Sequence, residues 1–148
     1  MKTLGSIVKD ASRDLYTVPA DDTVQSAVQQ MVKRNIGAVI VVDRERVVGL
    51  FSERDLMKRV VAQSLNPEAV LVRDVMTTEL IIGEPEQSYE DGIRKMHEAR
   101  CRHLPILENN NLLGIVSLRD LLEFDVDEKA EEIRTLHTYI HYLPPGLQ

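Results

Sequence analysis

The chain has 148 residues, of which 43% are hydrophobic and 28% charged, a composition typical of a folded globular protein. Its net charge of −6 argues against nucleic acid as the main partner, because a duplex-binding surface needs Lys and Arg to neutralise phosphates. No apolar run is long enough to cross a bilayer, and the N-terminus lacks a signal-peptide core, so no membrane partner is expected. A single cysteine, Cys101, excludes an intramolecular disulfide and favours a reducing, cytoplasmic location.

The chain contains two copies of one segment, offset by 65 residues. Ser-Glu-Arg-Asp-Leu at 52–56 recurs as Ser-Leu-Arg-Asp-Leu at 117–121, and the same offset aligns glycines and apolar positions on both sides. One copy alone is marginal as a folding unit, so the two copies are expected to share a core. The sequence is therefore divided into repeat 1 (5–62), a connector (63–74), repeat 2 (75–123) and a C-terminal helix and tail (124–148).

Repeat 1 is predicted to form a strand, a helix, two strands and a closing helix. The expected elements in chain order are an extended segment near 15–18, a helix from Thr23, a strand at 38–42, a polar turn at 43–46, a strand at 47–51 and a helix from Ser52. The uninterrupted β-branched run at 38–42 indicates a strand that is buried on both faces.

Repeat 2 shows the same order of elements. An extended segment near 80–82 comes first, followed by a helix from Ser88, where Ser88 and Asp91 resemble a capping box with a shortened acid. The turn at 109–111 consists of asparagines, which tolerate the left-handed conformation, and a second strand at 112–116 leads into a helix from Ser117.

Residues 125–143 carry a separate helical pattern with one apolar face, acidic residues in the first turns and Pro144 after its end. Two interpretations stay open: the apolar face packs back on its own module, or it contacts a dimer partner or another protein. His137 and His141 lie four residues apart and could share a metal, but no third ligand is evident, so no metal site is predicted.

The most informative pattern is Gly-x-x-Ser-x-x-Asp, which occurs at 49–55 and again at 114–120. In one interpretation it is only a capping box that opens each closing helix. In the other, Ser and Asp also project into a cleft between the copies, where the carboxylate accepts both ribose hydroxyls and the helix N-terminus favours a phosphate. The two roles can coexist.

Two such motifs that close tandem β-α-β-β-α units resemble a pair of cystathionine β-synthase (CBS) domains, also called a Bateman module. The resemblance covers residues 5–123, and it includes Asp-Val-Met-Thr at 74–77 and Arg-His-Leu-Pro-Ile at 102–106. It implies an α/β fold of two repeats packed sheet to sheet with pseudo-twofold symmetry, followed by the C-terminal amphipathic helix. It also implies a regulatory, signal-transduction role, adenosine sites in the cleft and a homodimer.

The resemblance assigns Ser117 and Asp120 to one nucleotide site and Ser52 and Asp55 to the other. Family members often carry basic residues just before the buried strand, where they meet phosphates. Arg102 and His103 stand there in repeat 2, and they are expected to make the Ser117–Asp120 site the better phosphate binder. Gly37 stands there in repeat 1, where its amide could bind or its small size could admit a larger ligand. Two further arginines either reach a phosphate or are solvated, namely Arg54 and Arg119.

No nucleophile, base and orienting acid form a catalytic set, and no Walker-type glycine loop is present, so neither an enzyme nor a catalytic cofactor is predicted. The expected ligand is AMP, ADP or ATP, with NAD or S-adenosylmethionine as alternatives. The competing hypothesis is a structural or protein-interaction module whose motifs are only caps. In either case the effect is expected to reach a regulated partner protein.

Overall fold

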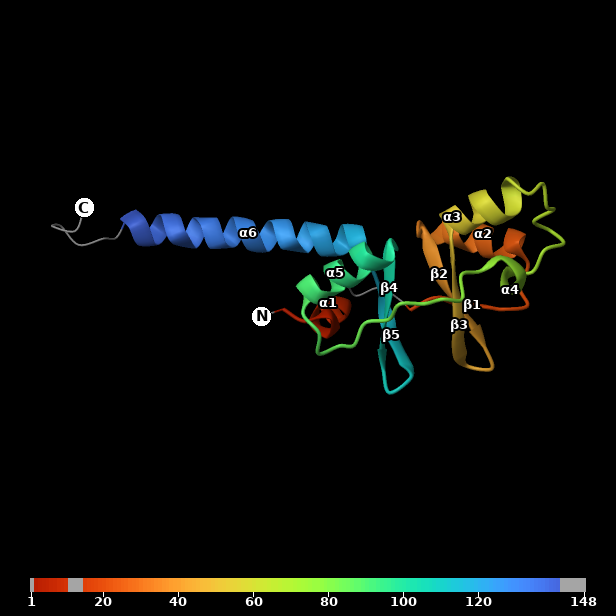
Figure 1. The fold of residues 1–148 in the computed structure, drawn as a ribbon, viewed down its shortest axis with the longest axis horizontal. Coiled ribbons are helices and arrows are strands. Elements are labelled where there is room, and N and C mark those ends of the chain that lie inside the picture. Colours follow the sequence, from red (N-terminus) through yellow and green to blue (C-terminus); the bar gives the residue numbers. More distant parts are fainter. Residues whose placement is uncertain (1, 11–14, 142–148) are drawn as a thin grey trace.

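The computed structural model describes residues 2–10 and 15–141, except for the side chains of residues 10 and 139–141. Two α/β halves lie side by side, and a long helix extends from one of them (Figure 1). Repeat 1 contains β1 (Thr17–Pro19), α2 (Val24–Arg34), β2 (Ala38–Asp43), β3 (Arg46–Ser52), α3 (Glu53–Asp55) and the π-helix η1 (Leu56–Val61). The other elements are α1 (Leu4–Asp10), α4 (Val72–Val75), α5 (Tyr89–Ala99), β4 (His103–Glu108), β5 (Asn111–Ser117) and α6 (Leu118–His141).

The two small sheets follow the predicted order of strands, with one correction. In repeat 1, β1 pairs in parallel with β2, which pairs antiparallel with β3; in repeat 2, β4 pairs antiparallel with β5. The expected extended segment at 80–82 is not a strand, and repeat 2 keeps only a parallel bridge between Gly83 and Ile106. This bridge is equivalent to the pairing of Val18 with Val41. Gly83 and Pro85 are poor strand formers, which explains the shortened element.

The predicted helix starts are confirmed at Thr23 and Ser88. Thr23 Oγ1 accepts a hydrogen bond from the Ser26 amide at 3.1 Å, and Ser88 Oγ accepts one from the Asp91 amide at 3.2 Å. The capping box expected at Ser88 is only half formed, because the Asp91 carboxylate pairs with Arg94 instead.

The core of each half includes a residue from the segment that precedes the other half. Leu4, which precedes repeat 1, is fully buried among the core residues of repeat 2, and its amide donates to the Gln87 carbonyl at 2.8 Å. Val72 has the equivalent place in repeat 1, with its amide donating to the Asp22 carbonyl at 2.9 Å. Each half is therefore completed by the segment that precedes the other half, and the two repeats are interlocked.

Sheet-to-sheet packing joins the halves as predicted. Along β2 the side chains alternate, so that Val39 and Val41 belong to the core beneath the helices of repeat 1, while Ala38 and Ile40 face the other way. The second group forms a separate apolar cluster that includes residues of repeat 2, such as Ile115 of β5. The strand at 38–42 is accordingly buried on both faces over most of its length.

The prediction of a separate C-terminal helix was wrong. The helix that closes repeat 2 and the helix predicted at 125–143 are one continuous element, α6, because no Gly or Pro interrupts residues 118–141. Its C-terminal half extends away from the rest of the molecule, so it does not pack back on its own module (Figure 1). Exposed apolar side chains such as Ile133 and Leu136 stay uncovered there. His141 and Pro144 lie outside the described side chains.

Candidate functional site

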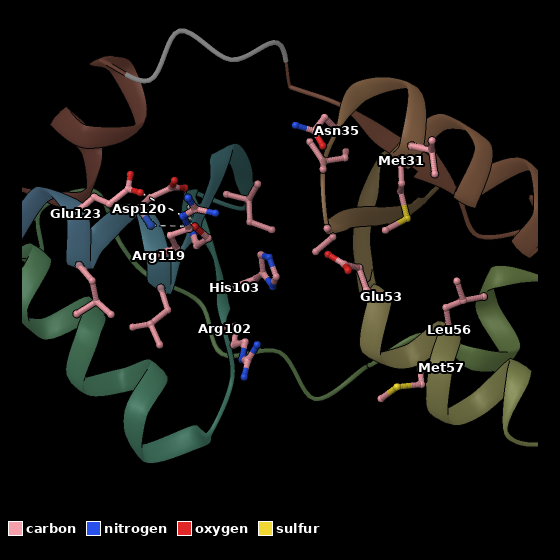
Figure 2. Close-up of a pocket in the computed structure, with 18 of the residues that line it drawn as sticks. Met31, Asn35, Glu53, Leu56, Met57, Arg102, His103, Arg119, Asp120 and Glu123 are labelled. Carbon is pink, nitrogen blue, oxygen red and sulfur yellow. Dashed lines mark hydrogen bonds and ion pairs between the residues drawn. The ribbon is translucent and has the colours of Figure 1, made fainter.

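Two pockets lie between the repeats, and each contains one copy of the repeated motif. The smaller, about 650 Å³, is bounded by the start of α3, by residues 77–81 near the start of repeat 2 and by residues 99–103 before β4. The larger, about 1780 Å³, is an open groove between α2 and η1 of repeat 1 and the start of α6 (Figure 2). Small-molecule sites usually measure roughly 300–1000 Å³, so the smaller pocket has the size of a single-ligand site.

Among the described residues, Asp55 is the one charged side chain that is buried. Its carboxylate is hydrogen-bonded to other groups of the protein. Oδ2 accepts hydrogen bonds from the Ser52 amide at 3.0 Å and from Ser52 Oγ at 3.1 Å, while the Asp55 amide donates to Ser52 Oγ at 3.2 Å. Oδ1 accepts a hydrogen bond from Thr77 Oγ1 at 2.9 Å and lies 3.8 Å from Arg59 Nε. The capping box predicted for this motif is therefore present, and ribose binding by the same residues stays a prediction.

Ser117 and Asp120 have the same reciprocal arrangement at the start of α6. The Ser117 amide donates to Asp120 Oδ2 at 3.1 Å, and the Asp120 amide donates to Ser117 Oγ at 3.0 Å. Asp120 is only half-buried and lines the larger groove, whereas Asp55 is buried beside the smaller pocket. The two motifs share one backbone design but differ in exposure.

The basic residues are not divided between the two pockets as the sequence suggested. Arg102 and His103 were expected to serve the Ser117–Asp120 site, but they line both pockets. Arg54 and Arg100 are two further arginines that line the smaller pocket, while Arg119 lines the larger groove. The basic pair of repeat 2 therefore also borders the Ser52–Asp55 site, which has no such pair before its own strand β2.

The packing of the repeats explains this correction. The amide of Leu118 donates to the Arg102 carbonyl at 2.7 Å, which keeps Arg102 beside the motif of its own repeat. Sheet-to-sheet packing also brings the segment before β4 opposite the motif of repeat 1, so the same two side chains border both pockets. The spacing of residues within repeat 1 could not reveal that residues of repeat 2 lie beside its motif.

Gly37 gives the ligand less room than the sequence suggested. A Cβ atom at this position would lie 2.2 Å from Glu53 Oε1, so the space beside Gly37 holds the Glu53 carboxylate. The Gly37 carbonyl also accepts a hydrogen bond from the Glu53 amide at 3.0 Å. Figure 2 shows Glu53 and His103 projecting toward each other from opposite repeats. An acidic group therefore faces the basic residues at the centre of the cleft.

Partial burial decides the protonation of His103. Loss of solvent lowers its pKa below the ordinary 6.5, and Arg102 acts in the same direction, although the charges of Asp120 and Glu53 oppose the shift. His103 is therefore neutral at neutral pH and can accept or donate one hydrogen bond. An anionic ligand would add a negative charge and favour the protonated form.

Cys101 lines the smaller pocket and is half-buried. Burial raises the pKa of its thiol, which keeps the thiol protonated and unreactive at neutral pH. The described residues contain no cluster of three or more His, Cys, Asp or Glu side chains that could hold a metal ion. Within the same residues, no helix combines the length and apolar character that crossing a membrane requires.

Fold and site together define a tandem pair of β-α-β-β-α repeats with motif-lined pockets between them. The chain belongs to the CBS domain family, which matches residues 6–62 and 72–127. CBS domain pairs are regulatory modules, and proteins made only of CBS domains are generally non-catalytic.

Known proteins agree with this assignment. The chain is 32% identical to the mitochondrial CBS domain-containing protein CBSX3 of Arabidopsis thaliana over 95% of its own length and 69% of that protein. A solved CBS-domain protein from Burkholderia ambifaria superposes with a TM-score of 0.81 at 36% identity, covering 85% of this chain and 95% of the other. The CBS domain pair of protein MJ0100, solved with 5′-methylthioadenosine and S-adenosylmethionine, has a TM-score of 0.76 at 19% identity, covering 86% and 98%.

Thr77 and Arg100 are among the residues of the smaller pocket that had no role in the sequence-based site. Thr77 was noted only as part of the Asp-Val-Met-Thr stretch, and its contact with Asp55 spans 22 residues. Arg100 ends α5 in the left-handed conformation, with φ of 55°, and this turn leads into the segment that lines the pocket. A charged residue at a helix C-terminus is a common pattern, so this one carried no specific signal.

Proposed function

We propose that the protein is a regulatory module that binds an adenine nucleotide in the smaller pocket. The observation that carries this proposal is the convergence of Arg54 from repeat 1 with Arg100 and Arg102 from repeat 2 around one pocket of ligand size. Guanidinium groups bind phosphate oxygens through charge-assisted hydrogen bonds. A nucleotide phosphate here would contact both repeats at once.

The other walls suit a nucleoside. Leu50, Leu80 and Ile81 provide apolar surface for a base, and Ser52 and Asp55 provide oxygen atoms for ribose hydroxyls. Asp55 Oδ1 keeps acceptor capacity beyond its bond from Thr77, because a carboxylate oxygen has two lone pairs. Capping and ribose binding by Asp55 are therefore compatible.

The charged residues of the smaller pocket favour a nucleotide with few phosphate groups. Glu53 and Glu79 line it together with the three arginines, and each added phosphate would raise the repulsion from these carboxylates. AMP or ADP is accordingly the favoured ligand over ATP. The complex of MJ0100 supports S-adenosylmethionine or 5′-methylthioadenosine as the second candidate class, and NAD is the third. Ser117, Asp120 and Arg119 are proposed as a second, more open nucleotide site, with Gly37 on its opposite wall.

Binding would regulate by clamping the repeats. A ligand held by residues of both halves stabilises the arrangement in which those residues converge, and it shifts the population of arrangements by its differential affinity. We propose that the module acts as a cytoplasmic homodimer that passes this change to a partner protein. A module that only binds proteins is the alternative, and it predicts no nucleotide affinity.

The test is isothermal titration calorimetry with AMP, ADP, ATP, NAD, S-adenosylmethionine and 5′-methylthioadenosine. Arg54→Ala and Arg119→Ala form a matched pair, because both arginines occupy the same position after the motif serine. We expect Arg54→Ala to weaken AMP binding about tenfold or more, the effect of losing a hydrogen bond between charged groups, while Arg119→Ala leaves the tighter site unchanged. Absence of heat from every ligand, with folded protein, would rule out the proposal.

A further inference from the structure

The C-terminal part of α6 (residues 126–141) carries an exposed apolar stripe. Ile133 is 55% exposed and Leu136 is 61% exposed, and Val126, seven residues before Ile133, is 66% exposed. Spacings of seven and three residues place these three side chains on one face of a helix. This part of α6 extends away from the two repeats (Figure 1), so the described residues of the repeats do not cover the stripe.

The stripe has the seven-residue spacing of a coiled coil. Val126, Ile133 and Ile140 recur every seven residues, which makes them a positions of the heptad. Lys129 and Leu136 stand at the d positions between them. The outward positions b, c and f carry polar residues, namely Asp127, Glu128, Glu131, Arg134, Thr135 and Thr138. Val or Ile at a with Leu at d favours two parallel helices.

The charged residues beside the stripe also agree with a parallel pair. In a parallel coiled coil, each g position faces the e position of the next heptad on the partner helix. Glu132 stands at g and His137 at the following e, both exposed, so a carboxylate would meet an imidazole that can donate a hydrogen bond to it. An antiparallel pair brings the g positions together, which would set the carboxylates of Asp125 and Glu132 against each other.

The base of α6 is fixed to repeat 2 before any partner binds. Leu121 is fully buried in the core of repeat 2, and Tyr89 Oη donates a hydrogen bond to Asp125 Oδ1 at 2.9 Å. The rings of Tyr89 and Phe124 meet edge to face, with their centroids 4.8 Å apart. A helix that is already formed and anchored loses little conformational entropy when it pairs, which lowers the cost of a short coiled coil.

We propose that the C-terminal part of α6 forms a parallel two-stranded coiled coil with the same segment of a second copy of this chain. Ile133 and Leu136 then pack against the same residues of the partner helix, around a twofold axis that runs along the coiled coil. Both modules lie at the same end of the coiled coil. Lys129, the polar residue among the core positions, fixes the register of the two helices at a cost in stability.

The first experiment is disulfide trapping in the full chain, with Cys101 replaced by Ser. Equivalent d positions face each other in a parallel, in-register coiled coil, so their cysteines are close enough to bond. We therefore expect Lys129→Cys and Leu136→Cys each to give a disulfide-linked dimer with oxidised glutathione. Thr135→Cys, at an exposed outward position beside Leu136, is the matched control and should stay unlinked.

Two results of the trapping would overturn the proposal. One is linkage of Thr135→Cys to the same extent as Leu136→Cys, because that shows collision without a specific contact. The other is a disulfide that forms only when Lys129→Cys and Leu136→Cys are mixed, because that pairing requires antiparallel helices. Absence of any disulfide overturns the proposal as well.

The second experiment is sedimentation equilibrium without nucleotide, on variants checked by circular dichroism. Lys129→Leu completes the apolar core and loses only a partly exposed contact with Asp125 at 4.0 Å, so it should strengthen self-association about tenfold or more. Leu136→Glu should weaken self-association about tenfold or more, while Thr135→Glu leaves it unchanged.

This inference assigns one contact of the homodimer proposed above and does not depend on nucleotide binding. A protein that dimerises equally well with Lys129→Leu and Leu136→Glu uses another surface, and that result would overturn the coiled coil alone. A wild type that stays monomeric would overturn the coiled coil together with the homodimer. Titration of AMP into Leu136→Glu tests the nucleotide proposal separately, because this residue lies outside both pockets.

Discussion

Thr77 Oγ1 donates a hydrogen bond to Asp55 Oδ1 at 2.9 Å, and this bond joins the start of repeat 2 to the helix that closes repeat 1. Arg59 strengthens the same junction, because its Nη1 donates to the Met76 carbonyl at 2.7 Å while its Nε lies 3.8 Å from Asp55. The carboxylate that the family motif would present to a ribose is thus also a structural element. Ligand binding and the stability of the junction are expected to be linked there.

The first prediction separates the two motif aspartates. Asp55→Ala removes a helix cap and a buried acceptor of the Thr77 hydroxyl, so we expect a loss of about 3 kcal/mol in the free energy of unfolding. Asp120→Ala removes the equivalent cap at a half-buried position and should cost about 1 kcal/mol. Urea denaturation without nucleotide measures both. Equal losses would show that the Thr77 contact contributes nothing.

The second prediction concerns pH. Because burial lowers the pKa of His103 in the folded state, the unfolded chain binds a proton more readily. The resulting stability is present above the unfolded-state pKa of about 6.5 and is lost as the pH falls through the lower, folded-state pKa. His103→Asn should therefore lose less stability than the wild type between pH 7.5 and pH 5. His97→Asn, at an exposed position of α5, is the control and should follow the wild type in thermal unfolding.

The third prediction uses the two hairpin turns. Arg44 and Glu45 have φ of 49° and 66°, and Asn109 and Asn110 of the other hairpin have φ of 50° and 64°. Left-handed conformations are costly for Arg and Glu and well tolerated by Asn and Gly. Replacing Arg44-Glu45 by Asn-Gly should stabilise the protein by about 1 kcal/mol. A lower melting temperature in differential scanning calorimetry would contradict this explanation.

The fourth prediction tests the interlocked core. Leu4→Ala should cost about 2–5 kcal/mol, because Leu4 is fully buried in the core of repeat 2. Hydrogen exchange should show the loss of protection in β4 and β5, although residue 4 precedes repeat 1 in the chain. Leu15→Ala, at a half-exposed position, is the control and should change little. Loss of protection confined to β2 and β3 would contradict this packing.

Local patterns predicted most of the fold because each depends on neighbouring residues. The β-branched run of β2, the caps at Thr23, Ser88, Ser52 and Ser117, and the Asn turn all follow from backbone preferences that a short segment expresses by itself. The 65-residue offset then predicted that two such units share a core. The prediction that the tail forms a separate helix was wrong. A change in the apolar pattern does not end a helix when no Gly or Pro interrupts it.

The sequence by itself determined the repeat, the family and the residues of the two capping motifs, since all of these are properties of residues near one another in the chain. Only the tertiary structure decided which residues share a pocket. Arg54 and the residues Arg100 and Arg102 line one pocket because packing of the sheets brings the two halves together. Glu53 fills the space beside Gly37 because the pairing of β2 with β3 places these two residues side by side. Likewise, only packing carried Leu4 into the core of repeat 2. Contacts between segments far apart in sequence follow from burial of apolar surface over the whole chain, which no local pattern contains.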